Sequence, residues 1–199
     1  MGDISSHGGE IEGALEPLRG NNIVLIGMRG SGKSTTAELL KTAIGNGIQV
    51  MDTDRMIEEK EGKTIKEIVD EHGEEHFRRL EDAAVQEAAN YHNVIIATGG
   101  GAVERPQNRH ALRKNSICIW LKANVPDLVT RAEKDTKNAT NRFPLTDEPS
   151  LAGEVTSVLE RRKSMYKETA DETIETSGKS PNQVAHEIFE KIQKRKGKS

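Results

Sequence analysis

The chain has little of several things that define large classes of protein. Its 199 residues include one cysteine, Cys118, so no disulfide can form within the chain, as is typical of proteins in a reducing cytoplasm. Aromatic residues make up only 3% of the chain, too few for base-stacking platforms or for the aromatic belts of membrane proteins. No apolar run approaches the length of a membrane span, and residues 1–20 contain no apolar stretch like that of a signal peptide. We therefore expect a cytoplasmic protein without membrane partners.

The charge pattern excludes a further class of partner. The net charge of −3 is made of both signs along the whole chain, so no basic face is available to attract nucleic acid. A chain of this length is expected to form one well-buried domain. We assign that domain to residues 21–195, between a flexible N-terminal extension over residues 1–20 and a basic tail over residues 196–199.

Short apolar runs alternate with segments of helical period. Unbroken apolar runs such as residues 24–26 are typical of strands that are covered on both faces of a parallel sheet. The alternation predicts βαβ units, and hence an α/β fold of three layers, α/β/α, around a five-stranded parallel sheet. We expect Trp120, Tyr91 and Tyr166 to be packed. Strands are predicted over residues 22–27, 48–52, 93–99, 116–121 and 171–176. Helices are predicted over residues 33–45, 54–60, 64–71, 75–90, 106–114, 125–135, 151–169 and 181–195.

One stretch carries specific chemistry. The residues GMRGSGKS (27–34) satisfy G-x-x-x-x-G-K-[ST] and lie between a predicted strand and a predicted helix, as that motif requires. Its glycines let the backbone curl until successive N–H groups point at phosphate oxygens, and the helix adds its positive N-terminal end. Lys33 would neutralise the β- and γ-phosphates, and the hydroxyl of Ser34 would bind Mg²⁺. The predicted nucleotide-binding residues are Gly30, Ser31, Gly32, Lys33, Ser34 and Thr35.

A phosphate loop alone leaves GTPases, motor ATPases and small-molecule kinases open. The tetrapeptide N-K-x-D, with which GTPases read guanine, does not occur in the chain. Motor ATPases usually carry a metal-binding aspartate at the end of another strand, but the strand predicted over residues 93–99 runs into three glycines with no acid. The carboxylate beside the metal must therefore come from elsewhere, and Asp52 in MDTDRM is the best-placed candidate.

Five segments taken together resemble the shikimate kinase family: GMRGSGKST, MDTDRMIE, GEEHFRRLE, TGGGAV and RRKSMYKETAD. They occur in the order and spacing of that family and span roughly residues 21–195. The resemblance implies a P-loop kinase fold in the style of the nucleoside-monophosphate kinases, with a mobile lid. It also implies the reaction, which is transfer of the γ-phosphoryl group of ATP to the 3-hydroxyl of shikimate.

The resemblance gives separate roles to the two aspartates of D-x-D. Asp52 would lie near Mg²⁺, whereas Asp54 would bind hydroxyls of shikimate and act as a base-like catalytic residue. With different partners both carboxylates can stay ionised, although they are only two residues apart. Asp54 could also, or instead, cap the helix that begins beside it.

The carboxylate of shikimate needs fixed positive charge, which arginine supplies with two parallel hydrogen bonds. The family pattern places one such arginine directly after Phe77, at Arg78, and the other in R-x-x-x-Y, at Arg162. Arg161 is the neighbour that could be confused with Arg162. The alternative for each is an exposed helix arginine paired with a glutamate. Glu81, three residues after Arg78, is expected to hold the rotamer of that arginine.

Three consecutive glycines follow a predicted strand, where bare backbone can approach a ligand closely. The resemblance implies that Gly100 contacts shikimate and that Gly99 and Gly101 shape the turn. A plain tight turn is the alternative, but three glycines cost folding entropy if nothing requires them.

The polar segment over residues 134–150 takes the place of the family's lid, which closes over ATP and brings an arginine to the transferring phosphoryl group. Arg142 is the candidate for this catalytic, ATP-binding arginine, and Arg131 would lie along the adenine. The family usually has R-P-L, whereas this chain reads RFPL with Phe143 inserted. Either Arg142 acts from a shifted register or its role is partly altered, and a solvated loop is the alternative.

Taken together, the residues and the resemblance predict a monomeric, ATP- and Mg²⁺-dependent shikimate kinase. One alternative is a kinase of the same fold that acts on another hydroxy acid, such as gluconate. The joint presence of the D-x-D pair, Arg78, the three glycines and Arg162 argues against it. The other alternative is a nucleotide-binding regulatory protein that has lost turnover, and only the altered RFPL lid favours it.

Overall fold

The computed structural model describes residues 18, 21–45, 47–134 and 143–196. The described strands form one parallel sheet of five strands in the order β2-β3-β1-β4-β5. The strands are β1 (Asn22–Ile26), β2 (Gln49–Asp52), β3 (Val94–Ala97), β4 (Ser116–Lys122) and β5 (Glu172–Glu175). The helices are α2 (Lys33–Ile44), α3 (Thr53–Glu61), α4 (Ile65–His72), α5 (Glu74–Ala89), α6 (Pro106–Arg113), α7 (Val125–Lys134), α9 (Leu151–Thr169) and α10 (Pro181–Lys196).

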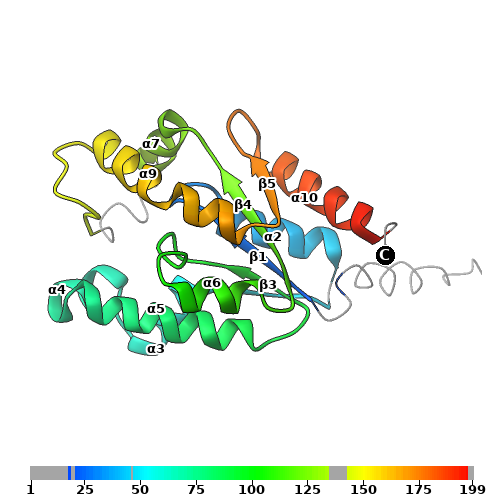
Figure 1. Ribbon diagram of the computed structural model, residues 1–199, viewed down its shortest axis with the longest axis horizontal. Helices are drawn as coiled ribbons and strands as arrows, with labels where there is room; N and C mark the ends of the chain where they lie inside the picture. The colour runs from blue at the N-terminus through cyan, green and yellow to red at the C-terminus, as the bar shows by residue number, and fades with distance from the viewer. Residues whose placement is uncertain (1–17, 19–20, 46, 135–142, 197–199) are drawn as a thin grey trace, which may run out of the picture.

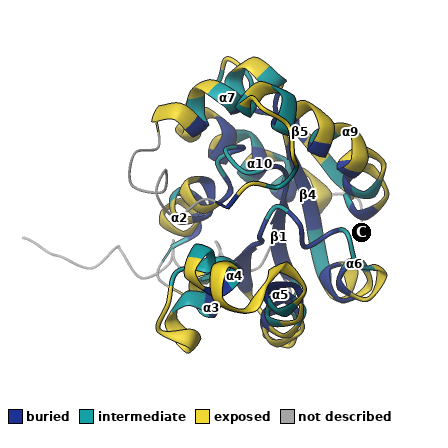
Figure 2. Ribbon diagram, turned by 90° about the vertical axis from the view of Figure 1, so that its left-hand side faces the viewer, coloured by how far each residue is buried: buried dark blue, intermediate teal, exposed yellow. Residues whose placement is uncertain are grey.

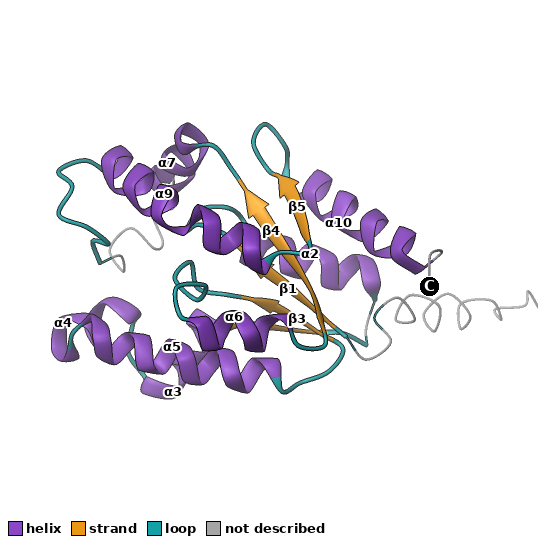
Figure 3. Cartoon of the chain, in the orientation of Figure 1, coloured by secondary structure: helices purple, strands orange, loops and turns teal. Residues whose placement is uncertain are grey.

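Helices cover both faces of the sheet (Figures 1 and 3). Because neighbouring residues of a strand point to opposite faces, Ile23 and Leu25 pack into the cluster formed with α2 and α10. Val24 and Ile26 pack into the opposite cluster, which α5, α6 and α9 complete. Figure 2 shows the result, with buried strands between helices whose outer surfaces are exposed. The three-layer α/β/α fold with a five-stranded parallel sheet is confirmed.

A third, smaller apolar cluster joins α3, α4 and α5. It contains Ile57, Ile68, Phe77 and Ala84, and Phe143 packs into it from the segment before α9. The start of α4 is fixed by a capping box, in which the Thr64 side chain and that of Glu67 satisfy each other's backbone N–H groups. This cluster therefore forms a wall of packed helices beside the sheet, and it supports the helix that carries Arg78.

The predicted elements all occur, with boundaries within two residues of those predicted. Leu18, within the predicted N-terminal extension, is fully buried in the cluster of α2 and α10. The last helix includes Lys196, the first residue of the predicted tail. Tyr91 is 46% exposed, so the prediction that it packs is wrong; the residue follows the end of α5 at the surface. In the part of the chain that the structure describes, no helix is both long and apolar enough to cross a bilayer.

The topology brings the sequence motifs together. The central strand β1 has β3 on one side and β4 on the other, so the strand order reverses at β1. The strands β1, β2 and β3 run in parallel, and each is followed at its carboxyl end by one of the motifs: the phosphate loop, the D-x-D pair or the three glycines. Ligands of open α/β sheets bind in the crevice at this edge, where the strand order reverses.

Candidate active site

The phosphate loop joins β1 to α2. Gly27 has φ 147°, and a Cβ there would lie 2.5 Å from the carbonyl oxygen of Leu121, so only glycine fits without movement of the backbone. Gly32, at the start of α2, has the left-handed φ of 94°. Lys33 is only 8% exposed, and its ammonium group donates hydrogen bonds of 2.9 Å to the carbonyls of Gly27 and Met28. The lysine is thus folded back along the loop, over the place where phosphates would lie.

The pKa values of Lys33 and Asp54 are both shifted toward neutral pH, that of Lys33 from above and that of Asp54 from below. Burial lowers the pKa of Lys33 to about 8, although the carboxylates of Asp54 and Asp52 oppose this shift. Burial raises the pKa of Asp54 to about 7, and the negative charges of Asp52 and Glu81 add to the rise. Oδ1 of Asp54 is buried and has no hydrogen-bond partner among the described residues. A carboxyl group with its pKa near 7 and an open acceptor can take up a proton at neutral pH.

Asp52 ends β2, and its carboxylate accepts hydrogen bonds from both α2 and α3. Its Oδ2 accepts a hydrogen bond of 2.6 Å from the hydroxyl of Ser34, in the first turn of α2. Its Oδ1 accepts from the backbone N–H groups of Asp54 (3.1 Å) and Arg55 (3.3 Å), and so caps α3. The capping role considered for Asp54 therefore belongs to Asp52, and the carboxylate of Asp54 is left for another purpose.

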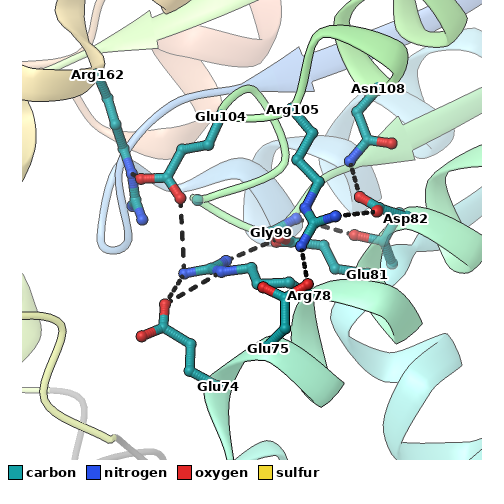
Figure 4. Close-up of polar contacts among 12 residues, drawn as sticks. Glu74, Glu75, Arg78, Glu81, Asp82, Gly99, Glu104, Arg105, Asn108 and Arg162 are labelled. Atoms are coloured by element: carbon teal, nitrogen blue, oxygen red, sulfur yellow. Dashed lines mark hydrogen bonds and ion pairs between the residues drawn. The ribbon is translucent and has the colours of Figure 1, made fainter.

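Two buried arginines from different helices face the same region (Figure 4). Arg78, on α5, is 7% exposed, and its Nη1 donates to Glu81 at 2.8 Å, the partner expected from the spacing. Arg162, on α9, is 1% exposed, and its Nη2 is buried without a hydrogen-bond partner among the described residues. The side chain of Arg161 is 52% exposed. Burial thus distinguishes Arg162 from its neighbour, and neither predicted arginine is exposed. Arg78 does pair with Glu74, one turn earlier, at 2.8 Å, so the pairing in that alternative occurs but the exposure does not.

Of the three glycines after β3, Gly99 and Gly101 are needed for space, because charged side chains lie directly against them. A Cβ at Gly99 would lie 2.6 Å from carboxylate oxygens of both Asp54 and Glu81. A Cβ at Gly101 would collide with the guanidinium of Arg78. Gly100 is held by its carbonyl, which accepts a hydrogen bond of 2.6 Å from the hydroxyl of Tyr166. The turn therefore lies between the acidic and the basic groups of the site.

Most of these groups line one pocket of about 810 Å³, although Gly99 is not among its lining residues. One part of its wall is the phosphate loop and the start of α2, and the other contains Asp54, Arg78, Gly100 and Arg162. The volume lies within the range of small-molecule sites. Its polar groups come from two sides, with backbone N–H groups and an ammonium on one side and two guanidiniums and a carboxyl on the other. This arrangement can hold a phosphorylated ligand next to a small organic acid.

The two remaining predicted ATP-binding residues are Arg131, just before the lid, and Arg142, within it. Arg131 lines the pocket, and its guanidinium donates to the carbonyl of Thr176 at 2.8 Å and to that of Gly30 at 3.4 Å. Arg142 lies outside the described residues. Phe143, next to it, is 5% exposed, and its ring meets that of Phe77 edge-on at 5.7 Å between centroids. The inserted Phe143 thus attaches the predicted lid segment to α5.

Some residues of the site were not predicted from the sequence. Glu104 lies between the buried arginines, and the hydroxyl of Thr53 accepts the N–H of Gly99 at 2.9 Å. The hydrogen bond from Tyr166 to Gly100 was not predicted either. Thr53 lies between the two aspartates, so the D-x-D motif could have drawn attention to it. Nothing local marks Glu104, because its contacts are 26 and 58 residues away along the chain.

The amino-acid sequence matches the family model described as shikimate kinase over residues 29–193. The shikimate kinase of Symbiobacterium thermophilum is 40% identical over 174 residues, which cover 87% of this chain and 97% of that relative.

Among solved structures, the shikimate kinase from Acinetobacter baumannii in complex with shikimate is similar with a TM-score of 0.83 and 31% identity. The match covers 92% of this chain and 98% of that one. A gluconokinase from Sinorhizobium meliloti 1021 has a TM-score of 0.52 at 15% identity and covers 87% of this chain and 92% of its own, a likeness that extends to the fold alone.

Proposed function

The chain belongs to the shikimate kinase family, and we propose that it transfers the γ-phosphoryl group of ATP to the 3-hydroxyl of shikimate. The observation that carries this proposal is the pair of buried arginines, Arg78 and Arg162, which line the same pocket as the phosphate loop. A buried arginine pair beside a phosphate site suits an acceptor that is itself a carboxylate.

ATP would bind along the phosphate loop. The residues that we assign to its phosphates are Gly30, Ser31, Gly32, Lys33, Ser34 and Thr35, all of which line the pocket. Arg131, beside the loop, is assigned to the adenine side. Arg142 stays the candidate for the lid arginine on the transferring group, as predicted from the sequence.

The acceptor would be held by its two ends. Arg78 and Arg162 would bind the carboxylate, and the turn of residues 99–101 would let the acceptor's ring approach the backbone. Asp54 would accept the proton of the 3-hydroxyl as its oxygen bonds to the γ-phosphorus. The bond from that phosphorus to the bridging oxygen breaks, and ADP leaves. Asp54 is suited to this exchange because its pKa is raised to about 7.

We assign Mg²⁺ to Ser34 and Asp52. The Ser34 hydroxyl and Oδ2 of Asp52 lie 2.6 Å apart, and hydroxyl and carboxylate oxygens are the hard donors that this ion prefers. When bound, the ion supplies positive charge beside the phosphates. A monomeric state, a cytoplasmic location and the absence of nucleic-acid and membrane partners stay predictions from the sequence.

The test is ADP production by the purified protein with ATP and Mg²⁺, with shikimate, with gluconate or with neither. Shikimate alone should drive the release of ADP. Release driven by gluconate would assign the acceptor site to another hydroxy acid, and ATP binding without turnover would favour the regulatory alternative.

Two neighbouring arginines provide a matched pair of variants. Arg162→Ala should lower kcat/KM for shikimate about a hundred-fold, because it removes a buried charge that binds the acceptor. Arg161→Ala removes a mostly exposed guanidinium and should change kcat/KM by less than about three-fold. Equal effects of the two changes would contradict the assignment of Arg162.

A further inference from the structure

Glu104 lies between the arginines of the candidate acceptor site (Figure 4). Its Oε1 accepts hydrogen bonds from Nε of Arg162 at 2.8 Å and from Nη2 of Arg161 at 2.9 Å. Its Oε2 lies 3.8 Å from Nη2 of Arg78. One carboxylate therefore faces both buried guanidiniums, which α5 and α9 supply from separate parts of the chain.

The turn that carries Glu104 is itself held in place. The backbone N–H of Glu104 donates to the carbonyl of Gly101 at 2.9 Å. Nη1 of Arg109 donates to the carbonyls of Val103 (2.7 Å) and Glu104 (3.1 Å). The backbone of Glu104 is thus anchored to the glycine turn and to α6, and its carboxylate orients the buried Arg162 relative to that turn.

Glu104 approaches Arg162 from outside the pocket. Arg78 and Arg162 line the pocket, whereas Glu104 is not among its lining residues. Glu104 occupies Nε of Arg162 and leaves Nη2 buried without a hydrogen-bond partner among the described residues. Nη1 and Nη2 lie 3.5 Å and 3.2 Å from the positions that a Cβ would take at Gly100 and Gly101, and both glycines line the pocket. Nη2 of Arg162 is therefore left without a protein partner beside two glycines that line the pocket.

The charge on Glu104 is maintained by its neighbours. Burial alone would raise the pKa of its carboxyl, but Arg162, Arg78 and Arg161 outweigh burial and lower it. An ionised Glu104 also reduces the repulsion between the arginine cations before any acceptor binds.

We propose that Glu104 is a positioning residue for recognition of the acceptor's carboxylate. By holding Arg162 through Nε, it directs the terminal N–H groups of that arginine toward the pocket beside Arg78. A carboxylate entering the pocket then meets an Arg162 that is already oriented, beside Arg78, whose guanidinium is held by Glu74 and Glu81. This inference rests on the proposed function, because it concerns how the same site recognises shikimate.

The experiment compares steady-state kinetics of wild type, Glu104→Ala and Glu104→Gln, with shikimate and ATP varied separately. Glu104→Ala should raise KM for shikimate about ten-fold, the loss expected for a charge-assisted hydrogen bond. KM for ATP and kcat should stay within about two-fold of wild type, because Glu104 touches neither the nucleotide site nor Asp54. Glu104→Gln keeps an acceptor for Nε of Arg162 and should show a smaller rise in the same constant.

Glu75→Gln is the matched control. It removes an exposed carboxylate that pairs with Arg105, the residue after Glu104, at 2.7 Å, and it should leave all three constants unchanged. An unchanged KM for shikimate in Glu104→Ala would overturn the proposal. So would a lowered KM, which would mean that Glu104 competes with the acceptor for the arginines.

A rise in both KM values and a fall in kcat of similar size, together with a lower melting temperature, would show that Glu104 has only a structural role. That result would also overturn the proposal. If Glu104→Ala does not fold, the isosteric Glu104→Gln variant decides by the same criteria. Failure of the proposed function is recognised separately, because the wild type would then release no ADP in response to shikimate.

Discussion

The hydroxyl of Tyr166 donates a hydrogen bond of 2.6 Å to the carbonyl of Gly100, 66 residues earlier in the chain. Tyr166 lies one turn after Arg162 on α9, and its ring stacks on that of Trp120 with 5.6 Å between centroids. The same helix therefore supplies a buried arginine to the pocket and holds the glycine turn that this arginine faces. The position of the turn relative to the arginine is fixed by one rigid element.

Tyr166→Phe should separate this hydrogen bond from the packing of the ring. The change leaves the carbonyl of Gly100 without its tyrosine partner, and we expect a loss of about 1–2 kcal/mol in the free energy of unfolding. KM for shikimate should rise roughly three- to five-fold as the turn loosens. Urea denaturation and steady-state kinetics measure the two effects. Tyr91→Phe, at a tyrosine that is 46% exposed, is the control and should change neither. An unaltered KM in Tyr166→Phe would show that the turn keeps its place without the hydroxyl.

The sequence was sufficient for the fold and for the motifs because both depend on local patterns. Apolar runs and helical periods mark the elements, and a parallel sheet with βαβ connections brings the carboxyl ends of its strands to one edge. That geometry is enough to place Lys33, Asp54, Gly100 and Gly101 around one pocket, as the structure does.

What the sequence did not predict depends on contacts between distant segments. The role of Glu104 exists only because α5 and α9 bring their arginines to the same turn. The inserted Phe143 is recognisable as a departure from the family pattern, but only the packed structure shows that it meets Phe77. Leu18 is buried although it precedes the first strand, because α2 and α10 form an apolar site for its side chain. The residues next to Leu18 in the sequence do not indicate that site.

The raised pKa of Asp54 predicts a specific dependence on pH. Folding moves this pKa from 3.8 to about 7, so the folded protein binds a proton more tightly than the unfolded chain does. The resulting stabilisation is present below pH 3.8 and is lost as the pH rises through about 7. Asp54→Asn cannot ionise at this position. The melting temperature of Asp54→Asn relative to that of wild type should therefore rise as the pH increases from 3.8 to about 7, and the difference should stay constant at higher pH.

The same variant tests the catalytic assignment. Asp54→Asn should lower kcat by roughly a hundred-fold or more, since it removes the group that accepts the proton. In wild type, kcat/KM should fall as the pH drops below about 7. Asp70→Asn, at an exposed residue of α4, is the control and should resemble wild type in both measurements. A melting-temperature difference that does not change with pH would contradict the buried, ionisable state of Asp54.

Phe143 should stabilise the protein through the cluster of α3, α4 and α5. Phe143→Ala removes a ring that is 5% exposed, and it should cost about 2–4 kcal/mol in the free energy of unfolding. Phe143→Leu keeps apolar volume and should cost less. Urea denaturation measures the difference. If both variants were as stable as wild type, the contact with Phe77 would contribute nothing to stability, and Phe143 would not anchor the predicted lid segment.

Asp52 is proposed to act on Mg²⁺ and is seen to cap α3, and one substitution can separate these roles. Asparagine caps helices as well as aspartate does, so Asp52→Asn should keep the free energy of unfolding within about 0.5 kcal/mol of wild type. It removes the negative charge beside Ser34, and the Mg²⁺ concentration for half-maximal ADP release should rise about ten-fold. Thr64→Ala reverses this pattern, because it removes the cap of α4 and should cost about 1 kcal/mol without changing the Mg²⁺ requirement. An unchanged Mg²⁺ requirement in Asp52→Asn would leave Asp52 with its capping role alone, and the charge beside the metal would have to come from another carboxylate of the pocket.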